Sequence, residues 1–246
     1  MVSCKFAAHF RKSLHKTSPS IIMLHTARIS VASLLALLFF YSCKNDPKDQ
    51  STNSTPKLDT IQEVAVSKVG AATFLVTGGT INWSGKKSIG DGHSGTINVE
   101  KGELLVNQNQ LINGKIILDM HSITVSDIKD AGERRDLESH LRDSDFFEAD
   151  KFPKAEFVIS QVLPSTNPAY NWLIVGDLTM KGKTKPVNIP VTMSIEGDKL
   201  KAQSVTFPIN RTEWGVNFHS GILGTAKDKL INDNVMLSLT LEAKKN

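Results

Sequence analysis

The residues best suited to bind an anion lie in the stretch "MKGKTKP", where Lys181, Lys183 and Lys185 follow one another at alternate positions. Alternating apolar residues precede and follow this stretch, which therefore marks a turn between two strands. Ammonium groups on one turn attract a phosphate when the turn lies at the mouth of a cavity. The alternative is a solvated turn whose lysines keep an exposed surface polar.

A second polar cluster is "INRTEWGV", which places Arg211 and Glu213 two residues apart. We expect the two side chains to share a face if the strand continues through them. Arg211 then either reaches an anionic group of a ligand or forms an internal salt bridge beside a packed Trp214. The residue types fit both interpretations.

The histidines give no sign of a metal site or of catalysis. Downstream of residue 42 they are His93, His121, His140 and His219. No pair has the helical i, i+4 spacing or the H-x-H spacing of metal ligands, and no nucleophile motif accompanies them. We therefore predict no catalytic residue, no metal and no cofactor. An enzyme that uses His121 or His219 is a less favoured alternative.

Cys43 follows an apolar stretch over residues 29–41, which is shorter than the roughly 20 residues of a membrane-spanning helix. The sequence "FFYSC" resembles a bacterial lipoprotein signal, which would make Cys43 the acylated first residue of the mature chain. We predict a leader over residues 1–42, with a possible true start at Met23. The expected location is the bacterial cell envelope, lipid-anchored, at the outer membrane. An uncleaved anchor is the alternative.

Charge and cysteine content argue against a nucleic-acid-binding protein and against a disulfide-stabilised fold. The chain has 29 basic and 25 acidic residues, but five of the basic residues and none of the acidic ones lie in residues 1–42. The rest of the chain carries a net charge of −1, which argues against a nucleic-acid partner. The only cysteines are Cys4 and Cys43, so the folded part contains no disulfide.

The chain after the leader is organised as a polar tether and one all-β domain. Residues 43–57 are polar and predict a flexible tether, and residues 58–246 are assigned to the domain. Hydrophobic residues alternate through "PVNIPVTMSIEG" and similar segments, which predicts antiparallel strands. Apparent turns separate these segments at 78–79, 90–92, 101–102, 182 and 196–198, whereas 113–114 is interpreted as a bulge. The charged segment 127–147 predicts one or two short helices.

Several segments in order resemble the YceI-like family: "TINWSGKKSIGDGHSGTINV", "DSDFFEADKFPKAEF", "VGDLTMKGKTKPVNIPV", "INRTEWGV" and "NDNVMLSLTLEAK". The resemblance covers residues 72–244. It implies an antiparallel, eight-stranded lipocalin-like barrel whose lumen holds an isoprenoid lipid such as a polyprenyl phosphate or a quinone. Many family members are free periplasmic proteins, so the lipoprotein-type leader is a departure that concerns location.

On this reading the inward-facing residues either fill a core or line a cavity, and the resemblance favours a cavity. The expected lining residues are Trp83, Ile97, Ile116, Leu118, Trp172, Ile174, Leu178, Val191, Met193, Phe207, Trp214 and Leu239. The expected head-group residues are Lys183, Lys185 and Arg211. The predicted partners are the lipid and a membrane through the N-terminal anchor, with a homodimer as an open option. A non-catalytic surface scaffold or adhesin with a packed barrel is the alternative.

Overall fold

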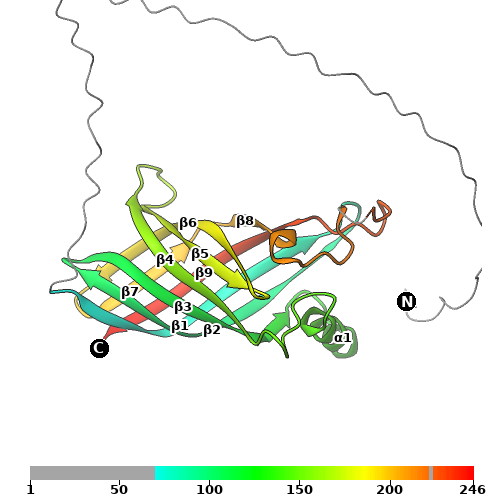
Figure 1. Ribbon diagram of the computed structural model, residues 1–246, viewed down its shortest axis with the longest axis horizontal. Helices are drawn as coiled ribbons and strands as arrows, with labels where there is room; N and C mark the ends of the chain where they lie inside the picture. Colours follow the sequence, from blue (N-terminus) through cyan, green and yellow to red (C-terminus); the bar gives the residue numbers. More distant parts are fainter. Residues whose placement is uncertain (1–69, 222–223) are drawn as a thin grey trace, which may run out of the picture. The chain divides into compact units, whose positions relative to one another are not determined.

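The computed structural model describes residues 70–221 and 224–246, which form a closed antiparallel β-barrel (Figure 1). Strand β1 pairs with β2 on one side and with β9 on the other, which closes the ring. β7 and β8 follow one another along the same edge of β9, so the two short strands together occupy one strand position of the barrel. The predicted eight-stranded barrel is therefore confirmed. The strands are β1 (Ala72–Lys86), β2 (Gly92–Asn107), β3 (Gln110–Val125), β4 (Lys154–Pro164), β5 (Trp172–Met180), β6 (Lys183–Glu196), β7 (Lys199–Ser204), β8 (Phe207–Asn210) and β9 (Asn234–Lys245).

The alternation of side chains along each strand produces the barrel wall. In β6, Val187, Val191 and Met193 are buried, whereas Asn188 and Thr192 between them are exposed. Successive side chains of a strand point to opposite faces, and closing the sheet places one whole face inside. The apolar face therefore becomes the lumen and the polar face meets solvent.

Two of the predicted turns are wrong, because residues 78–79 lie inside β1 and residues 101–102 lie inside β2. The strand register shifts at both places, as it does at a β-bulge. A Cβ on Gly79 would lie 2.7 Å from Cγ2 of Val99, and one on Gly102 would lie 2.7 Å from Cγ2 of Val76. These glycines therefore allow neighbouring strands to approach where long strands bend around the barrel. Residues 113–114 lie inside β3 as expected, and the register with β2 shifts beside them, between Leu111 and Asn113.

The helix expected in the charged segment is α1 (Ala131–Arg142), which lies at one end of the barrel (Figure 1). Oδ1 of Asp130 caps it by accepting hydrogen bonds from the backbone N–H groups of Gly132 and Glu133 at 2.8 and 2.9 Å. Leu141 is buried against the barrel core, so α1 covers one end of the lumen. We refer to this end as the α1 end.

A second short helix, the 3-10 helix η1 (Arg211–Trp214), also lies at the α1 end. The side chain of Asn210 caps its start by accepting from the N–H of Thr212, which ends the strand. The expectation that Arg211 and Glu213 share a strand face is therefore wrong. Arg211 is buried and Glu213 is exposed.

Several expectations concern residues outside the described part of the chain. They are the leader, the start at Met23, the lipidation of Cys43, the tether over residues 43–57 and the first residues of the domain, 58–69. Contacts group Thr60–Asn246 into one compact unit, which contains every strand of the barrel. Among the described residues, no helix has the length and apolar character needed to cross a membrane.

Strands β2 and β3 approach each other closely at Gly95, which allows the contribution of close strand packing to stability to be tested. A Cβ on the buried Gly95 would lie 1.8 Å from the carbonyl oxygen of Thr124 and 2.8 Å from the ring of Trp83. We expect Gly95→Ala to lower the free energy of unfolding by about 2 kcal/mol, measured by urea denaturation, because the strands must separate to admit the methyl group. Gly78→Ala is the control, since a Cβ there meets nothing within 4 Å. Equal stabilities of the two variants would contradict this account.

Candidate functional site

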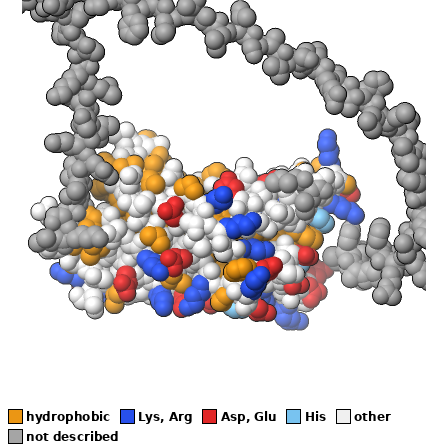
Figure 2. Space-filling model, viewed as in Figure 1, with side chains coloured by type: hydrophobic (Ala, Val, Ile, Leu, Met, Phe, Trp, Pro, Cys, Tyr) orange, Lys and Arg blue, Asp and Glu red, His pale blue; other side chains and the backbone are white. Residues whose placement is uncertain are grey.

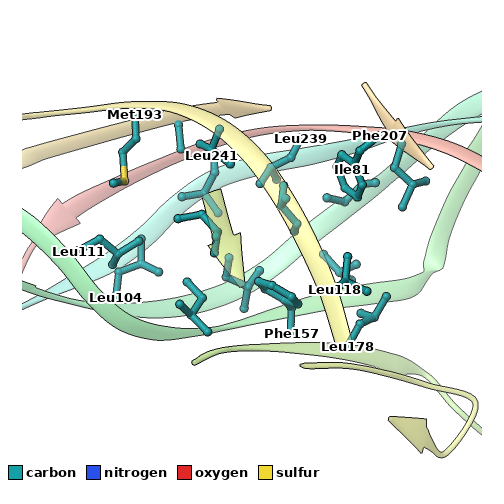
Figure 3. Close-up of a pocket in the computed structure, with 18 of the residues that line it drawn as sticks. Ile81, Leu104, Leu111, Leu118, Phe157, Leu178, Met193, Phe207, Leu239 and Leu241 are labelled. Carbon is teal, nitrogen blue, oxygen red and sulfur yellow. The ribbon is translucent and has the colours of Figure 1, made fainter. Parts of the chain in front are cut away.

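The lumen contains two adjoining apolar cavities. The first has a volume of about 90 Å³ and is lined by residues of all nine strands. Figure 3 shows apolar side chains from opposite walls pointing into this space, among them Leu118, Phe157, Leu239 and Leu241. Every lining residue is apolar. The space can therefore accept a hydrocarbon but gives water no polar partner.

The second cavity has a volume of about 160 Å³ and lies toward the α1 end. Both cavities are lined by a shared set of residues, so they follow one another along the lumen: Ile81, Leu118, Leu178, Ile209 and Leu237. The second cavity also has a polar rim, formed by Lys86, Lys87, Asp91, His93 and Arg211. The surface that faces this cavity is almost wholly apolar, so the charged groups of the rim mark one end of an apolar lumen.

Most of the predicted lining residues meet at these cavities. Those at the first are Ile116, Ile174, Val191, Met193, Phe207 and Leu239, those at the second are Trp83 and Ile97, and Leu118 and Leu178 reach both. The two exceptions are tryptophans. Trp172 is half-buried and packs beside the core, and Trp214 is buried with its Nε1 donating to the carbonyl of Leu178 at 3.0 Å.

Sequence reasoning missed the lining residues of β4. Phe157 and Ile159 line the first cavity, and Ala155 lines the second. These three residues occupy alternate positions in "KAEFVIS", so their spacing carried the signal of a half-buried strand.

The lysines of "MKGKTKP" lie at the α1 end but line neither cavity. Lys181 Nζ donates to the carbonyls of Phe146 at 2.5 Å and Ser144 at 3.5 Å, and so fastens the connection after α1. Burial lowers the pKa of the Lys181 ammonium, and the charge of Glu148 partly offsets this shift. Lys183 is exposed and Lys185 is half-buried, both on β6.

Arg211 lines the second cavity, but its donors are directed at the protein. Nε donates to the carbonyl of Asn232 at 3.2 Å, Nη1 to that of Val216 at 2.7 Å and Nη2 to that of Ile231 at 3.1 Å. Nη2 also lies 3.5 Å from Oδ1 of Asp233. Burial lowers the pKa of the guanidinium, while Asp233 opposes the shift. This geometry matches the internal salt-bridge interpretation.

A histidine–carboxylate pair stands on the polar rim. Nδ1 of His93 lies 2.9 Å from Oδ2 of Asp127, whose other oxygen accepts the N–H of Ser94 at 2.8 Å. Burial alone would raise the pKa of Asp127, but the hydrogen bonds from Ser94 and His93 outweigh it and lower the pKa. The pair thus fixes an ionised carboxylate and an oriented imidazole beside the cavity.

His121 lies outside both cavities, with Nε2 3.1 Å from Oδ1 of the exposed Asp150. A reaction that used this histidine would take place on the outer surface. Among the described residues, no group of three or more His, Cys, Asp and Glu side chains is arranged to hold a metal ion.

An aromatic cluster closes the α1 end. The ring of Phe218 lies 5.0 Å from Phe146, 4.8 Å from His140 and 4.0 Å from His219, centroid to centroid. Phe146 lines the second cavity, so the cluster joins the cavity wall to the chain after η1. Burial lowers the pKa of His219, and the positive charge of Lys229 lowers it further.

The fold and the site together define a closed antiparallel β-barrel with an apolar lumen that is polar at one end. A family model for the YceI-like domain matches residues 65–243, more than half of the chain. The chain belongs to the YceI-like domain family. The family resemblance found in the sequence is thereby confirmed.

Individual relatives match the chain over a shorter stretch than the family model does. A UPF0312 protein of Staphylococcus aureus strain USA300 is 34% identical over 107 residues, which are 41% of this chain and 57% of the relative. A UPF0312 protein of strain N315 is 32% identical over the same shares of the two chains. The chain thus spans somewhat more than half the length of the curated relatives it matches.

Two solved structures resemble the barrel. That of Burkholderia cenocepacia BcnA has a TM-score of 0.52 at 21% identity and covers 68% of this chain and 96% of its own. That of a polyisoprenoid binding domain from Saccharophagus degradans has a TM-score of 0.50 at 9% identity and covers 71% and 99%. At sequence identities of 21% and 9%, these similarities show a shared fold.

The lowered pKa of His219 predicts that the α1 end is sensitive to acid. A histidine whose folded pKa lies below its ordinary value of 6.5 favours folding when neutral, so this stability is lost as the pH falls through and below 6.5. We expect the melting temperature to fall on acidification through this window. His219→Asn should flatten the dependence, since asparagine does not titrate and tolerates the left-handed backbone found there. An unchanged pH dependence in this variant would contradict the assignment.

Proposed function

We propose that this protein binds an isoprenoid lipid, of the polyprenyl phosphate or quinone class, inside the barrel and catalyses no reaction on it. The observation that carries the proposal is the pair of adjoining apolar cavities, of about 90 and 160 Å³. An apolar cavity of about 150 Å³ is enough to stay dry and bind benzene. Each buried CH₂ of a ligand contributes about 0.8 kcal/mol before the cost of association.

The shape of the lumen favours a long chain over a compact ligand. Ligand pockets commonly measure roughly 300–1,000 Å³, which exceeds the two cavities together. A thin chain that runs through both cavities needs less width than a ring system. Flexible side chains on the wall, such as Met193, widen the passage at low cost. The fold shared with the polyisoprenoid binding domain of S. degradans supports the same choice.

The polar rim sets the direction of the ligand in this proposal. The hydrocarbon chain runs through both cavities, and the head group lies at the rim of the second, beside Lys86, Lys87 and His93. Ammonium groups suit a phosphate, and an oriented imidazole suits a quinone oxygen. The earlier candidates Lys183 and Lys185 line neither cavity, so the rim is better placed to receive the head group.

The scaffold alternative requires a fully packed lumen, and the two cavities argue against it. Interiors that have no function to serve are filled to the density of organic crystals. Space left between large aliphatic side chains in the centre of a barrel is therefore better explained by a ligand than by display of the outer loops.

The decisive experiment is to purify the chain from residue 44 without detergent, extract it with organic solvent and identify the extract by mass spectrometry. A stoichiometric polyprenyl lipid or quinone would support the proposal. An empty extract, together with no rise in melting temperature on adding farnesol or a quinone, would refute it. The second measurement covers an expression host that lacks the ligand.

A cavity-filling variant tests whether the ligand occupies the lumen. Ala202 lines the first cavity, and the neighbouring Gln203 faces solvent on the same strand, β7. We expect Ala202→Phe to weaken farnesol binding, measured by fluorescence titration, by at least about tenfold, because the benzyl group occupies space that the hydrocarbon needs. Gln203→Phe adds the same group outside the barrel and should bind like the parent. Equal binding by both variants would exclude the first cavity as the site.

We also propose that acylated Cys43 anchors the protein to an envelope membrane, on the basis of the sequence "FFYSC" after the apolar stretch. Two or three acyl chains suffice for stable anchoring, whereas one does not. We expect the full-length Cys43→Ala protein to lose lipid labelling and shift from the membrane fraction to the soluble fraction of its host. A variant that still carries a labelled lipid would disprove this anchor.

A further inference from the structure

The α1 end carries a projection built from two segments that are distant in sequence. The tip of the β1–β2 hairpin, residues 86–92, lies against the loop over residues 226–232 (Figure 1). The N–H of Ser88 donates to the carbonyl of Leu230 at 2.9 Å, and the N–H of Asn232 donates to that of Lys86 at 2.8 Å. The side chains of Ser88 and Asn232 are also hydrogen-bonded, at 3.0 Å. We call these two segments the paired tip.

The paired tip presents an apolar residue to solvent. Ile89 is 61% exposed, more than any other large hydrophobic residue in the described part of the chain. It stands at the end of a hairpin, where it has no wall of the barrel to pack against. A single isoleucine at the point of a projection suits insertion into a soft apolar phase better than it suits a shaped protein pocket.

The paired tip is basic although most of the chain is not. It contains Lys86, Lys87, Lys227 and Lys229 against Asp91 and Asp228, a net charge of +2. From residue 43 onward the chain has a net charge of −1, so the remainder carries −3. Figure 2 shows basic side chains projecting from this end of the barrel. A local positive charge is therefore turned toward whatever approaches the tip.

The position of the tip relates it to the lumen. Lys86, Lys87 and Ile231 belong to the paired tip and also line the second cavity. Whatever the tip contacts therefore stands at the polar end of the lumen. A ligand that leaves the cavity at this end emerges beside Ile89.

We propose that the paired tip docks on an anionic membrane surface, with Ile89 entering the acyl region and the lysines meeting the lipid phosphates. The inference rests on the proposed function, because a lipid ligand that is nearly insoluble in water is best exchanged where the cavity faces a bilayer. The charge complementarity of the tip and its single apolar point select a membrane over a protein partner. Docking depends on the barrel and is separate from any anchor at Cys43.

The test measures partition of the chain from residue 44 onto vesicles, since it lacks the leader and Cys43 but contains the compact unit that holds the barrel. The vesicles contain phosphatidylglycerol and phosphatidylcholine, or phosphatidylcholine alone, and sedimentation gives the bound fraction. We expect stronger binding to the anionic vesicles, weakened by added salt. The double variant Lys86→Glu with Lys87→Glu should bind at least about tenfold less, as should Ile89→Asp.

Matched controls place the same changes at the other end of the barrel. Lys199→Glu with Lys245→Glu alters the net charge equally at two exposed lysines, and Leu163→Asp removes an apolar residue that is 42% exposed. Both should bind vesicles like the parent. A cooperative thermal transition in each variant excludes misfolding as the cause. Equal binding by tip and control variants, or no preference for anionic vesicles, would overturn the proposal.

Farnesol titration of the same proteins separates this inference from the proposed function. Ile89 lines neither cavity, so an Ile89→Asp variant that binds farnesol like the parent but loses the vesicles supports docking as a separate property of the tip. Vesicle binding by a parent that binds no farnesol would support docking and refute the lumen as a lipid site. A parent protein that binds farnesol but does not bind vesicles would refute docking and leave the proposed function standing.

Discussion

Pairing of β1 with β9 is the constraint on which the structure depends, because it closes the sheet and divides every strand into an inner and an outer face. Closure supplies hydrogen-bond partners to both edges and leaves the inner face with no access to water. Residues on that face must then be apolar, which makes the lumen suitable for hydrocarbon. The bends at Gly79 and Gly102 belong to the same constraint, since straight strands of this length would not close.

The α1 end has to be closed without a continuous β-ladder, and a buried arginine and a half-buried lysine do this. Arg211 donates to three backbone carbonyls of the chain that follows it, and Lys181 donates to the connection after α1. Trp214 adds a bond to the carbonyl of Leu178. Irregular segments leave carbonyls that require partners, and long polar side chains are the available donors. Polar residues that resemble a binding site in sequence thus serve to hold the end together.

The properties of the lumen and of its surroundings are concentrated at one end. The second cavity, its polar rim, the His93–Asp127 pair, the aromatic cluster and the paired tip all lie at the α1 end. The opposite end is made of short hairpin turns and the chain terminus. The contacts that we propose for the head group and for the membrane therefore fall at the same end of the barrel.

Sequence alone determined the antiparallel strands and most of their inward-facing residues, because alternation is a local property that survives in the folded state. The expectation of a closed barrel came from the family resemblance, and the pairing of β1 with β9 confirms it. It also predicted α1, whose polar, charged stretch could not be a strand of the wall. Tertiary structure decided which cations face the cavity: Lys86 and Lys87 come to the rim through pairing with Ile231 and Asn232, far away in the chain. It also decided that 78–79 and 101–102 are bends rather than turns, because a glycine's role depends on the strand that approaches it.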